Sequence, residues 1–188
     1  MRRFAIFSLA LTLLGVAGMD VRLAGQETPK APAPQKEHEW LQQFVGEWET
    51  ESEAMLEPGK PPMKCQGAEK ARAIGGLWVV SEITSLMQGQ TMLGVLTIGY
   101  DPEKKKYVGT WIDSMTPHLW KYEGTVDAAG KILTLEAEGP NMMMPGKMAK
   151  YRDVWELKSK DHKVLTSSML GDDGKWTTFM TMNARRKK

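Results

Sequence analysis

Short clusters of turn-forming residues divide the chain at regular intervals, and this spacing restricts the possible fold more than any other feature. Each cluster contains Gly, Pro or Asp, and successive clusters lie about fourteen residues apart on average. Nine of them follow residue 55, at positions 57–59, 75–76, 88–90, 101–104, 116–117, 127–130, 145–146, 159–162 and 171–174. Such an interval holds one strand but leaves no room for a long crossover. Nine turns of this kind predict ten consecutive antiparallel strands.

The segments between the turns alternate in polarity as half-buried strands do. Four glutamates occupy the odd positions from 47 to 53, whereas Trp48, Thr50, Ser52 and Ala54 occupy the even positions. One face of this strand is therefore expected to meet solvent, and the other to face the interior. Residues 93–98 are apolar or small on both faces apart from one threonine, so this strand is predicted to be covered on both sides.

Only one segment has the periodicity of a helix. In residues 37–46, Trp40, Leu41 and Phe44 lie on one face, and Gly46 marks the end. A short N-terminal helix followed by ten strands predicts an all-β domain, an up-and-down antiparallel barrel, because closure removes the exposed edges of the sheet. A barrel of this size can enclose a ligand cavity; a barrel filled by its own side chains is the alternative.

The tripeptide Gly46-Glu47-Trp48, placed after the helix at the start of the first strand, resembles the Gly-x-Trp signature of lipocalins and related calycins. In that superfamily the tryptophan closes one end of the barrel and is covered by an arginine from the end of the last strand. Arg185 or Arg186 stands in the matching place, and we assign Arg185 to the pair with Trp48 as a cation–π contact.

A broader resemblance covers residues 38–186. The segments FVGEWETE, GGLWVVSE, LGVLTIGYDPEKKKYVGTWIDSM, YEGTVDAAGKILTLEAEGP and TMNARRK are similar to the bacterial domain-of-unknown-function 1579 family. This resemblance implies a calycin-like barrel and a secreted or periplasmic setting, but no reaction. Nitrobindin, a ten-stranded haem-binding barrel, is a more distant analogue whose iron ligand is a histidine near the start of the last strand. Residues 176–180 contain no histidine, although Met180 is an axial ligand in principle, and no cofactor is predicted.

The N-terminal region is typical of an exported protein. Two arginines precede an apolar run over residues 4–19, and small residues follow it. The run is short for a membrane span, which needs about 20 residues, and no later segment is longer, so no stable membrane insertion of the mature chain is expected. We predict a signal peptide over 1–25, a disordered Pro-rich linker over 26–37, and a lipocalin-like β-barrel domain over 38–188.

Charge and cysteine content exclude two classes of protein. Without residues 1–25 the chain loses three arginines and one aspartate from its 25 basic and 23 acidic residues, which leaves 22 of each. A neutral chain has no electrostatic basis for binding nucleic acid. Cys65 is the only cysteine, so an intramolecular disulfide is impossible, and we expect its side chain to be buried.

Residues 110–120, TWIDSMTPHLW, place Asp113, Ser114 and His118 close together in the sequence, and these three residue types form the catalytic triad of many hydrolases. The period of a strand, however, puts Ser114 on the face opposite Asp113. A hairpin that turns at 116–117 would pair Asp113 with Trp120 and leave Ser114 pointing away, so a Ser-His-Asp site is not expected. The remaining face is aromatic, carries one acid and one imidazole, and comprises Trp111, Asp113, Met115, His118, Trp120 and Tyr122. Such a face is typical of a cavity wall.

Methionine is unusually frequent. Twelve of the 14 methionines follow residue 26, and four lie between Met142 and Met148. Thioethers bind Cu(I), but this segment is a predicted loop with no His or Cys beside it. A flexible apolar lid at the barrel mouth is the interpretation we favour. His38 and His162 are far apart in the sequence and do not indicate a zinc site.

These patterns predict an exported barrel that binds a small apolar molecule. The predicted ligand-binding residues are Trp78, Met87, Met92, Trp111, Asp113, Met115, His118, Trp120 and Met169. Two alternatives remain open: an enzyme that uses Asp113 and His118 as acid and base in the same cavity, and a Met-rich copper-binding protein. No catalytic residue and no metal ligand is assigned.

Overall fold

The computed structural model describes residues 31–55 and 59–188. The predicted signal peptide, residues 1–25, lies outside the described residues. Every helix and strand of the described part belongs to one compact unit, Ala33–Lys188. The first helix, α1, starts at Lys36, two residues before the predicted start of the domain.

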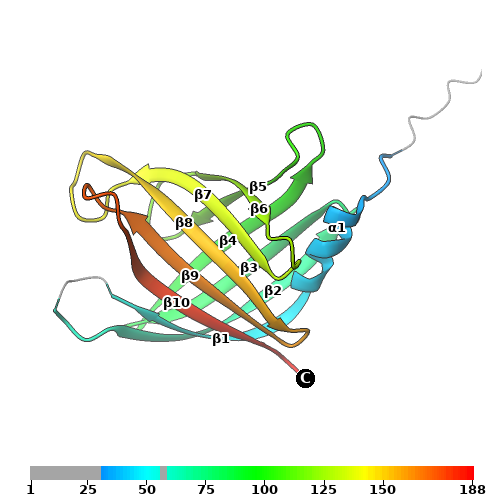
Figure 1. Cartoon of the computed structure of the whole chain (residues 1–188). Helices are drawn as coiled ribbons and strands as arrows, with labels where there is room; N and C mark the ends of the chain where they lie inside the picture. Colours follow the sequence, from blue (N-terminus) through cyan, green and yellow to red (C-terminus); the bar gives the residue numbers. More distant parts are fainter. Residues whose placement is uncertain (1–30, 56–58) are drawn as a thin grey trace, which may run out of the picture. The chain divides into compact units, whose positions relative to one another are not determined.

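Ten strands form a closed antiparallel barrel, as predicted. Each strand pairs with the next one along the chain, and the first pairs with the last, so the described sheet has no free edge (Figure 1). The strands are β1 (Gly46–Ala54), β2 (Met63–Ile74), β3 (Trp78–Met87), β4 (Gln90–Asp101), β5 (Lys106–Asp113), β6 (Trp120–Val126), β7 (Ile132–Pro140), β8 (Met148–Ser159), β9 (His162–Leu170) and β10 (Trp176–Arg186).

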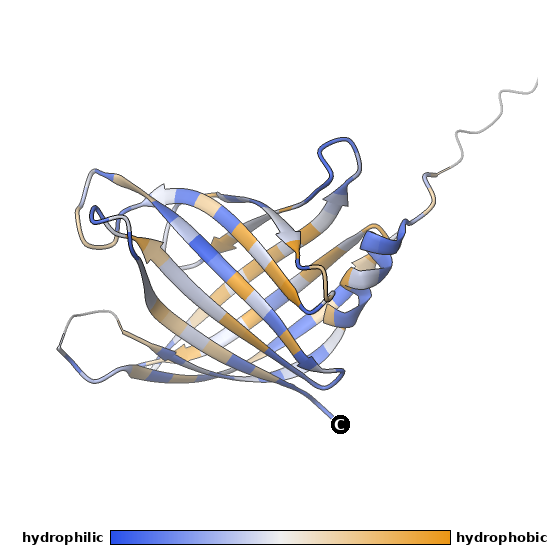
Figure 2. Cartoon of the chain, viewed as in Figure 1, coloured by the Kyte–Doolittle hydropathy of each residue, from blue (hydrophilic) through white to orange (hydrophobic). Residues whose placement is uncertain are grey.

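The alternation read from the sequence determines which side chains fill the barrel. Apolar and polar residues alternate along most strands in Figure 2, because neighbouring side chains point to opposite faces. On β1 the glutamates are exposed, whereas Trp48 and Thr50 are buried. Cys65 on β2 is buried, as expected. The prediction for residues 93–98 is wrong at Leu93, which is 56% exposed on the outer face of β4.

The N-terminal helix closes one end of the barrel. It comprises α1 (Lys36–Leu41) and a 3-10 turn, η1 (Gln42–Phe44), and lies at the end that also holds the C-terminus in Figure 1. Its residues Leu41 and Phe44 are fully buried. Trp40 Nε1 donates a 2.7 Å hydrogen bond to the carbonyl of Gly130 in the β6–β7 turn. The side chain of His38 bonds the carbonyl of Tyr100 on β4 at 3.1 Å. These bonds fix the helix on the rims of strands far apart in the sequence.

Trp48 forms the expected cation–π pair, but with a different arginine. The guanidinium of Arg186 lies 4.1 Å from the centre of the Trp48 ring, and its Nη1 donates to the carbonyl of Val45 at 2.7 Å. The assignment of Arg185 is wrong because Arg185 occupies an outward position on β10 and is exposed. The side chains of β10 alternate, so Ala184 and Arg186 share the inner face.

A buried ion pair lies next to this aromatic end. Lys163 Nζ on β9 donates to Glu69 Oε1 on β2 at 2.8 Å, and both side chains are 0% exposed. Ser81 Oγ donates to the same oxygen at 2.8 Å, whereas Glu69 Oε2 has no hydrogen-bond partner within the described residues. The ammonium also lies 4.4–5.0 Å from the ring centres of Phe44, Trp48 and Trp155. Burial lowers the pKa of Lys163, and the Glu69 charge opposes this effect. We call this region, comprising Phe44, Trp48, Glu69, Lys163 and Arg186, the sealed end.

Candidate ligand-binding cavity

The interior beyond the sealed end is hollow. A cavity of about 420 Å³ is enclosed by inward-facing side chains of the strands and by residues of the loops at the opposite end. Most of its wall is apolar, and it carries an unusual number of rings: Trp111, Trp120, Tyr122, Tyr151, Trp155 and Phe179. Small hydroxyl side chains such as Thr50 and Ser85 complete the wall. A volume of this size suits a small organic molecule.

Two tryptophans of the wall rest on glycines of neighbouring strands. A Cβ added to Gly94 would lie 2.0 Å from the Trp111 ring, and one added to Gly139 would lie 2.2 Å from the Trp120 ring. A larger residue at either glycine would therefore displace its ring. The Trp120 ring also packs edge-on against Tyr151, with centroids 4.8 Å apart. The glycines thus determine how the aromatic wall is shaped.

One carboxylate, Asp153 on β8, lines the cavity and forms hydrogen bonds with two other lining residues. Its Oδ2 accepts a 2.7 Å hydrogen bond from the hydroxyl of Tyr122, and its Oδ1 accepts a 2.5 Å bond from Ser167 Oγ. Burial raises the pKa of Asp153, and the two hydrogen bonds partly offset that rise. Burial, together with the neighbouring carboxylate, raises the pKa of Tyr122 well above its usual range.

A second carboxylate, Asp113, lies at the rim and stabilises the β5–β6 loop. Its Oδ1 accepts hydrogen bonds from the backbone N–H groups of Met115 and Thr116 at 2.7 and 2.8 Å. Its Oδ2 accepts a 2.8 Å bond from Trp111 Nε1. The Asp113 side chain therefore caps its own loop and orients the Trp111 ring. Short polar side chains commonly hold loops in this way.

The predicted register of this hairpin is wrong by two positions. Trp120 pairs with Trp111, not with Asp113, because residues 112–119 all lie between the last paired positions of β5 and β6, so the connection is not centred on residues 116–117. A shift of two positions preserves parity, so Trp111 and Asp113 still face inward together with Trp120. The Ser114 hydroxyl instead accepts a hydrogen bond from the Leu93 N–H at 3.1 Å.

The structure places four of the predicted ligand-binding residues on the cavity wall: Met92, Trp111, Asp113 and Trp120. Their role in binding stays a prediction. Met87 and Met169 are partly buried near the ends of β3 and β9, outside the set of residues that line the cavity.

Three further predicted ligand-binding residues, besides Met87 and Met169, lie outside the set that lines the cavity. Trp78 is 40% exposed on the outer face of β3, where its ring covers Gly99 of β4, so it does not line the cavity. Met115 is 55% exposed in the β5–β6 loop, where strand alternation no longer applies. His118 lies in the same loop, outside the residues that line the cavity; its ring packs edge-on against Trp120, and its Nε2 bonds the Glu138 carbonyl at 3.3 Å.

Asp113 and His118 are held by different partners. Asp113 binds its own loop and Trp111, whereas His118 binds the backbone of β7. An acid and a base that act together need a shared hydrogen bond or a shared substrate position. Neither side chain is oriented by the other in this structure.

The methionine-rich segment is the β7–β8 loop, at the end of the barrel opposite α1 (Figure 1). Met142 lines the cavity and is 48% exposed. Asn141 Oδ1 accepts hydrogen bonds from the N–H groups of Met143 and Met144, and so holds the turn. The described ranges contain no group of three or more His, Cys, Asp or Glu side chains that could hold a metal ion.

Sequence reasoning missed Asp153 as a site residue. Alternation along β8 could have shown that Asp153 faces inward, because Tyr151, Asp153 and Trp155 occupy every second position and share the inner face. The partners of Asp153 could not be read locally, because Tyr122 and Ser167 come from two other strands.

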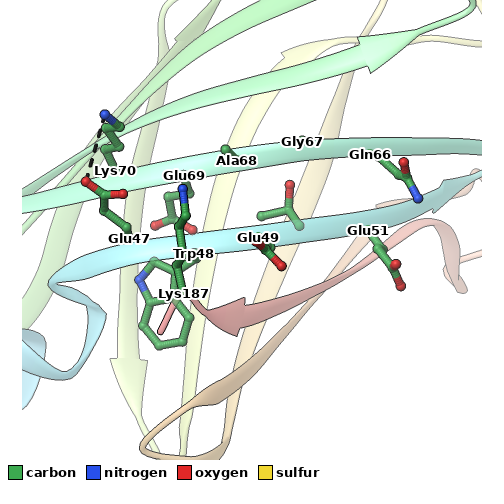
Figure 3. Close-up of a pocket in the computed structure, with 11 residues that line it drawn as sticks. Glu47, Trp48, Glu49, Glu51, Gln66, Gly67, Ala68, Glu69, Lys70 and Lys187 are labelled. Carbon is green, nitrogen blue, oxygen red and sulfur yellow. Dashed lines mark ion pairs between the residues drawn. The ribbon is translucent and has the colours of Figure 1, made fainter.

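A second hollow, of about 440 Å³, lies along the outer wall between β1 and β2 (Figure 3). Glu49 and Glu51 on β1 and Gln66 on β2 extend exposed side chains beside it, and small residues at 67 and 68 leave the space open. Glu47 at its edge pairs with Lys70 at 3.8 Å. This hollow is polar and solvent-facing, so it suits an apolar ligand less well than the aromatic cavity.

Comparisons with known proteins agree with the fold. The profile of the family described as "Protein of unknown function (DUF1579)" matches residues 33–186. No curated protein matches the chain. Among solved structures, Rv2717c from M. tuberculosis is similar with a TM-score of 0.58 and 10% identity, over 82% of this chain and 99% of that one. An S-type phycobiliprotein lyase from Guillardia theta has a TM-score of 0.54 and 12% identity, over 82% and 99% of the two chains. At such identities the likeness concerns the fold alone.

No helix within the described residues is long and apolar enough to cross a membrane.

Proposed function

Because the chain belongs to the DUF1579 family, whose description assigns no activity, we propose a function from the cavity itself: the barrel binds a small, mainly apolar molecule between its aromatic wall and its methionine-rich loop. The observation that carries this proposal is the contrast between the two ends. One end is filled by a helix, buried rings and an ion pair, whereas the other encloses about 420 Å³ lined by six aromatic rings. Ligand sites in proteins are typically concave, apolar and few.

The mouth of the cavity supports the same proposal. Met142, Met143 and Met148 expose their side chains in and beside the β7–β8 loop. Exposed apolar side chains grouped at a cavity mouth are characteristic of ligand entry sites. Methionine adapts its shape to different ligands, because its side chain is unbranched and polarisable.

We also propose that the ligand is encountered outside the cytoplasm. This proposal rests on the apolar run of residues 4–19 and the two arginines before it. Fractionation of the native host, with mass measurement of the mature N-terminus, tests it. Recovery of the uncleaved chain from the cytoplasm would contradict export.

Titration with the uncharged fluorescent dye N-phenyl-1-naphthylamine tests binding directly. Ser85→Phe would fill the cavity from β3, whereas Thr84→Phe places the same ring on the outer face of the same strand. We expect saturable 1:1 binding that Ser85→Phe weakens by about tenfold or more, while Thr84→Phe leaves it within about twofold. Equal affinities in the two variants would refute the cavity as the binding site. Native mass spectrometry of protein from its own host then identifies any molecule retained.

A further inference from the structure

The cavity has a one-sided charge. Two of its lining residues are acidic, Asp113 and Asp153, and within residues 31–55 and 59–188 no Lys, Arg or His lines it. The two acids differ in the hydrogen-bond acceptor positions that remain for a ligand. The oxygens of Asp113 accept bonds from Trp111, Met115 and Thr116, which are all local.

Asp153 retains capacity for a ligand. Each carboxylate oxygen can accept about two hydrogen bonds. Oδ1 receives one from Ser167 and Oδ2 receives one from Tyr122, so each oxygen has a further acceptor position. Both donors are neutral hydroxyls. When it is ionised, the Asp153 carboxylate is therefore stabilised by hydrogen bonds, but these donors do not neutralise its charge.

Two basic side chains of the strands that carry Asp153 and Ser167 are engaged elsewhere. Arg152, the sequence neighbour of Asp153, points to the outer face, where it pairs with Glu136 at 2.7 Å and covers the Trp176 ring at 3.9 Å. Lys163, which faces inward on β9, is held by Glu69 at 2.8 Å. Within the described residues, the inward-facing carboxylate of Asp153 thus has no cationic partner. Burying a charge is unfavourable unless it is paired, so a cationic ligand would gain more here than a neutral one.

The rings around Asp153 favour the same class of ligand. Tyr122, Tyr151 and Trp155 line the cavity beside it, and Trp111 and Trp120 extend the wall towards the mouth. The face of an aromatic ring attracts a cation, most strongly where water is excluded. On the basis of the function proposed above, we propose that the cavity recognises an organic cation: a protonated amine on an apolar or aromatic body, with its ammonium group against Asp153.

Three probes with one skeleton test this proposal by calorimetry at neutral pH: 2-(1-naphthyl)ethylamine, 1-ethylnaphthalene and 1-naphthylacetic acid. We expect the amine to bind about tenfold or more tightly than the neutral hydrocarbon, and the acid most weakly. Asp153→Asn keeps the shape and hydrogen bonding of the side chain, so it should abolish the preference for the amine while the neutral probe binds as before. Asp113→Asn is the matched control, and there the preference should remain.

The outcomes separate the two proposals. Equal affinity for amine and hydrocarbon in the unaltered protein would overturn the cation proposal, whatever the stability of the variants. A preference that survives Asp153→Asn would overturn the assignment of the anchor, and tighter binding of an uncharged naphthyl alcohol than of the amine would indicate a hydrogen-bonding ligand instead. Failure of the proposed function gives a different result. In that case Ser85→Phe weakens the binding of neither the three probes nor the uncharged dye.

Discussion

Two inward-facing carboxylates of the described barrel, Glu69 and Asp153, have opposite environments. Glu69 at the sealed end meets Lys163 at 2.8 Å, and neither side chain is exposed. Asp153 in the cavity accepts hydrogen bonds from the hydroxyls of Tyr122 and Ser167, and no cation of the described part of the chain lines the cavity beside it. A buried charge that the protein pairs itself is part of the structure. A carboxylate that has no cationic partner and lies beside a cavity can instead be paired by a cationic ligand. From this difference we infer a structural role for the sealed end and a binding role for the opposite end.

The largest effect is expected from breaking the ion pair. Lys163→Met removes the cation and leaves Glu69 buried and unpaired, so we expect a loss of about 3–5 kcal/mol in the free energy of unfolding, measured by urea denaturation. The double variant Glu69→Leu/Lys163→Met removes both charges and should recover most of that loss. If the single and the double variant were equally unstable, packing rather than charge would hold the sealed end together.

A smaller loss is expected where a glycine supports the aromatic wall. The Cβ of Gly139→Ala would lie 2.2 Å from the Trp120 ring, so the ring must move, at a cost of about 1–3 kcal/mol. The same substitution in a Trp120→Leu background should cost much less, because the obstructing ring is gone. Thermal unfolding of the four proteins measures this coupling, and additive effects would show that Gly139 and Trp120 act independently.

Much of the fold could be predicted from the sequence, because turns and alternation are local. The ten strands, the short helix and the inward direction of Trp111, Asp113 and Trp120 depend on positions within one strand or one hairpin. One error arose where two strands meet, because the hairpin register depended on a loop of unknown shape. The Trp78 error was avoidable, because alternation within β3 places Trp78 on the outer face together with Glu82 and Thr84.

The candidate site was less predictable for the same reason. Asp153 becomes distinctive only through Tyr122 and Ser167, which are brought to it by the closed sheet. Glu69 and Lys163 are 94 positions apart in the chain, and no local pattern pairs them. Alternation shows that a polar residue faces inward, but not which strand across the barrel supplies its partner.

The two arginines at the end of β10 are neighbours in the sequence but face opposite sides of the barrel, so they provide a matched test of the sealed end. Arg186→Met removes the contact with the Trp48 ring and the hydrogen bond to the Val45 carbonyl, so we expect a loss of about 1–2 kcal/mol in stability. Arg185→Met removes the same charge from an exposed position and should change stability by about 0.5 kcal/mol or less. Chemical denaturation measures both, and equal losses would contradict the Trp48–Arg186 pair.

The smallest effect is the pH dependence of stability that Asp153 contributes. Burial raises its pKa in the folded state above the unfolded value of about 4, so the folded state binds this proton more tightly. Its contribution therefore favours folding at acidic pH and is lost as the pH rises through the folded pKa. Asp153→Asn should remove this slope and leave the protein at least as stable at neutral pH. A variant with an unchanged pH profile would mean that Asp153 is not desolvated.

The central claim is that the cavity at the open end, with Asp153 as its polar anchor, is the binding site. A crystal structure of the protein with 2-(1-naphthyl)ethylamine tests it most directly. The account predicts the naphthyl ring among Trp111, Trp120 and Tyr151, with the ammonium nitrogen at hydrogen-bond distance from an oxygen of Asp153. A probe bound in the outer hollow between β1 and β2, or bound in the cavity with its ammonium directed away from Asp153, would contradict it.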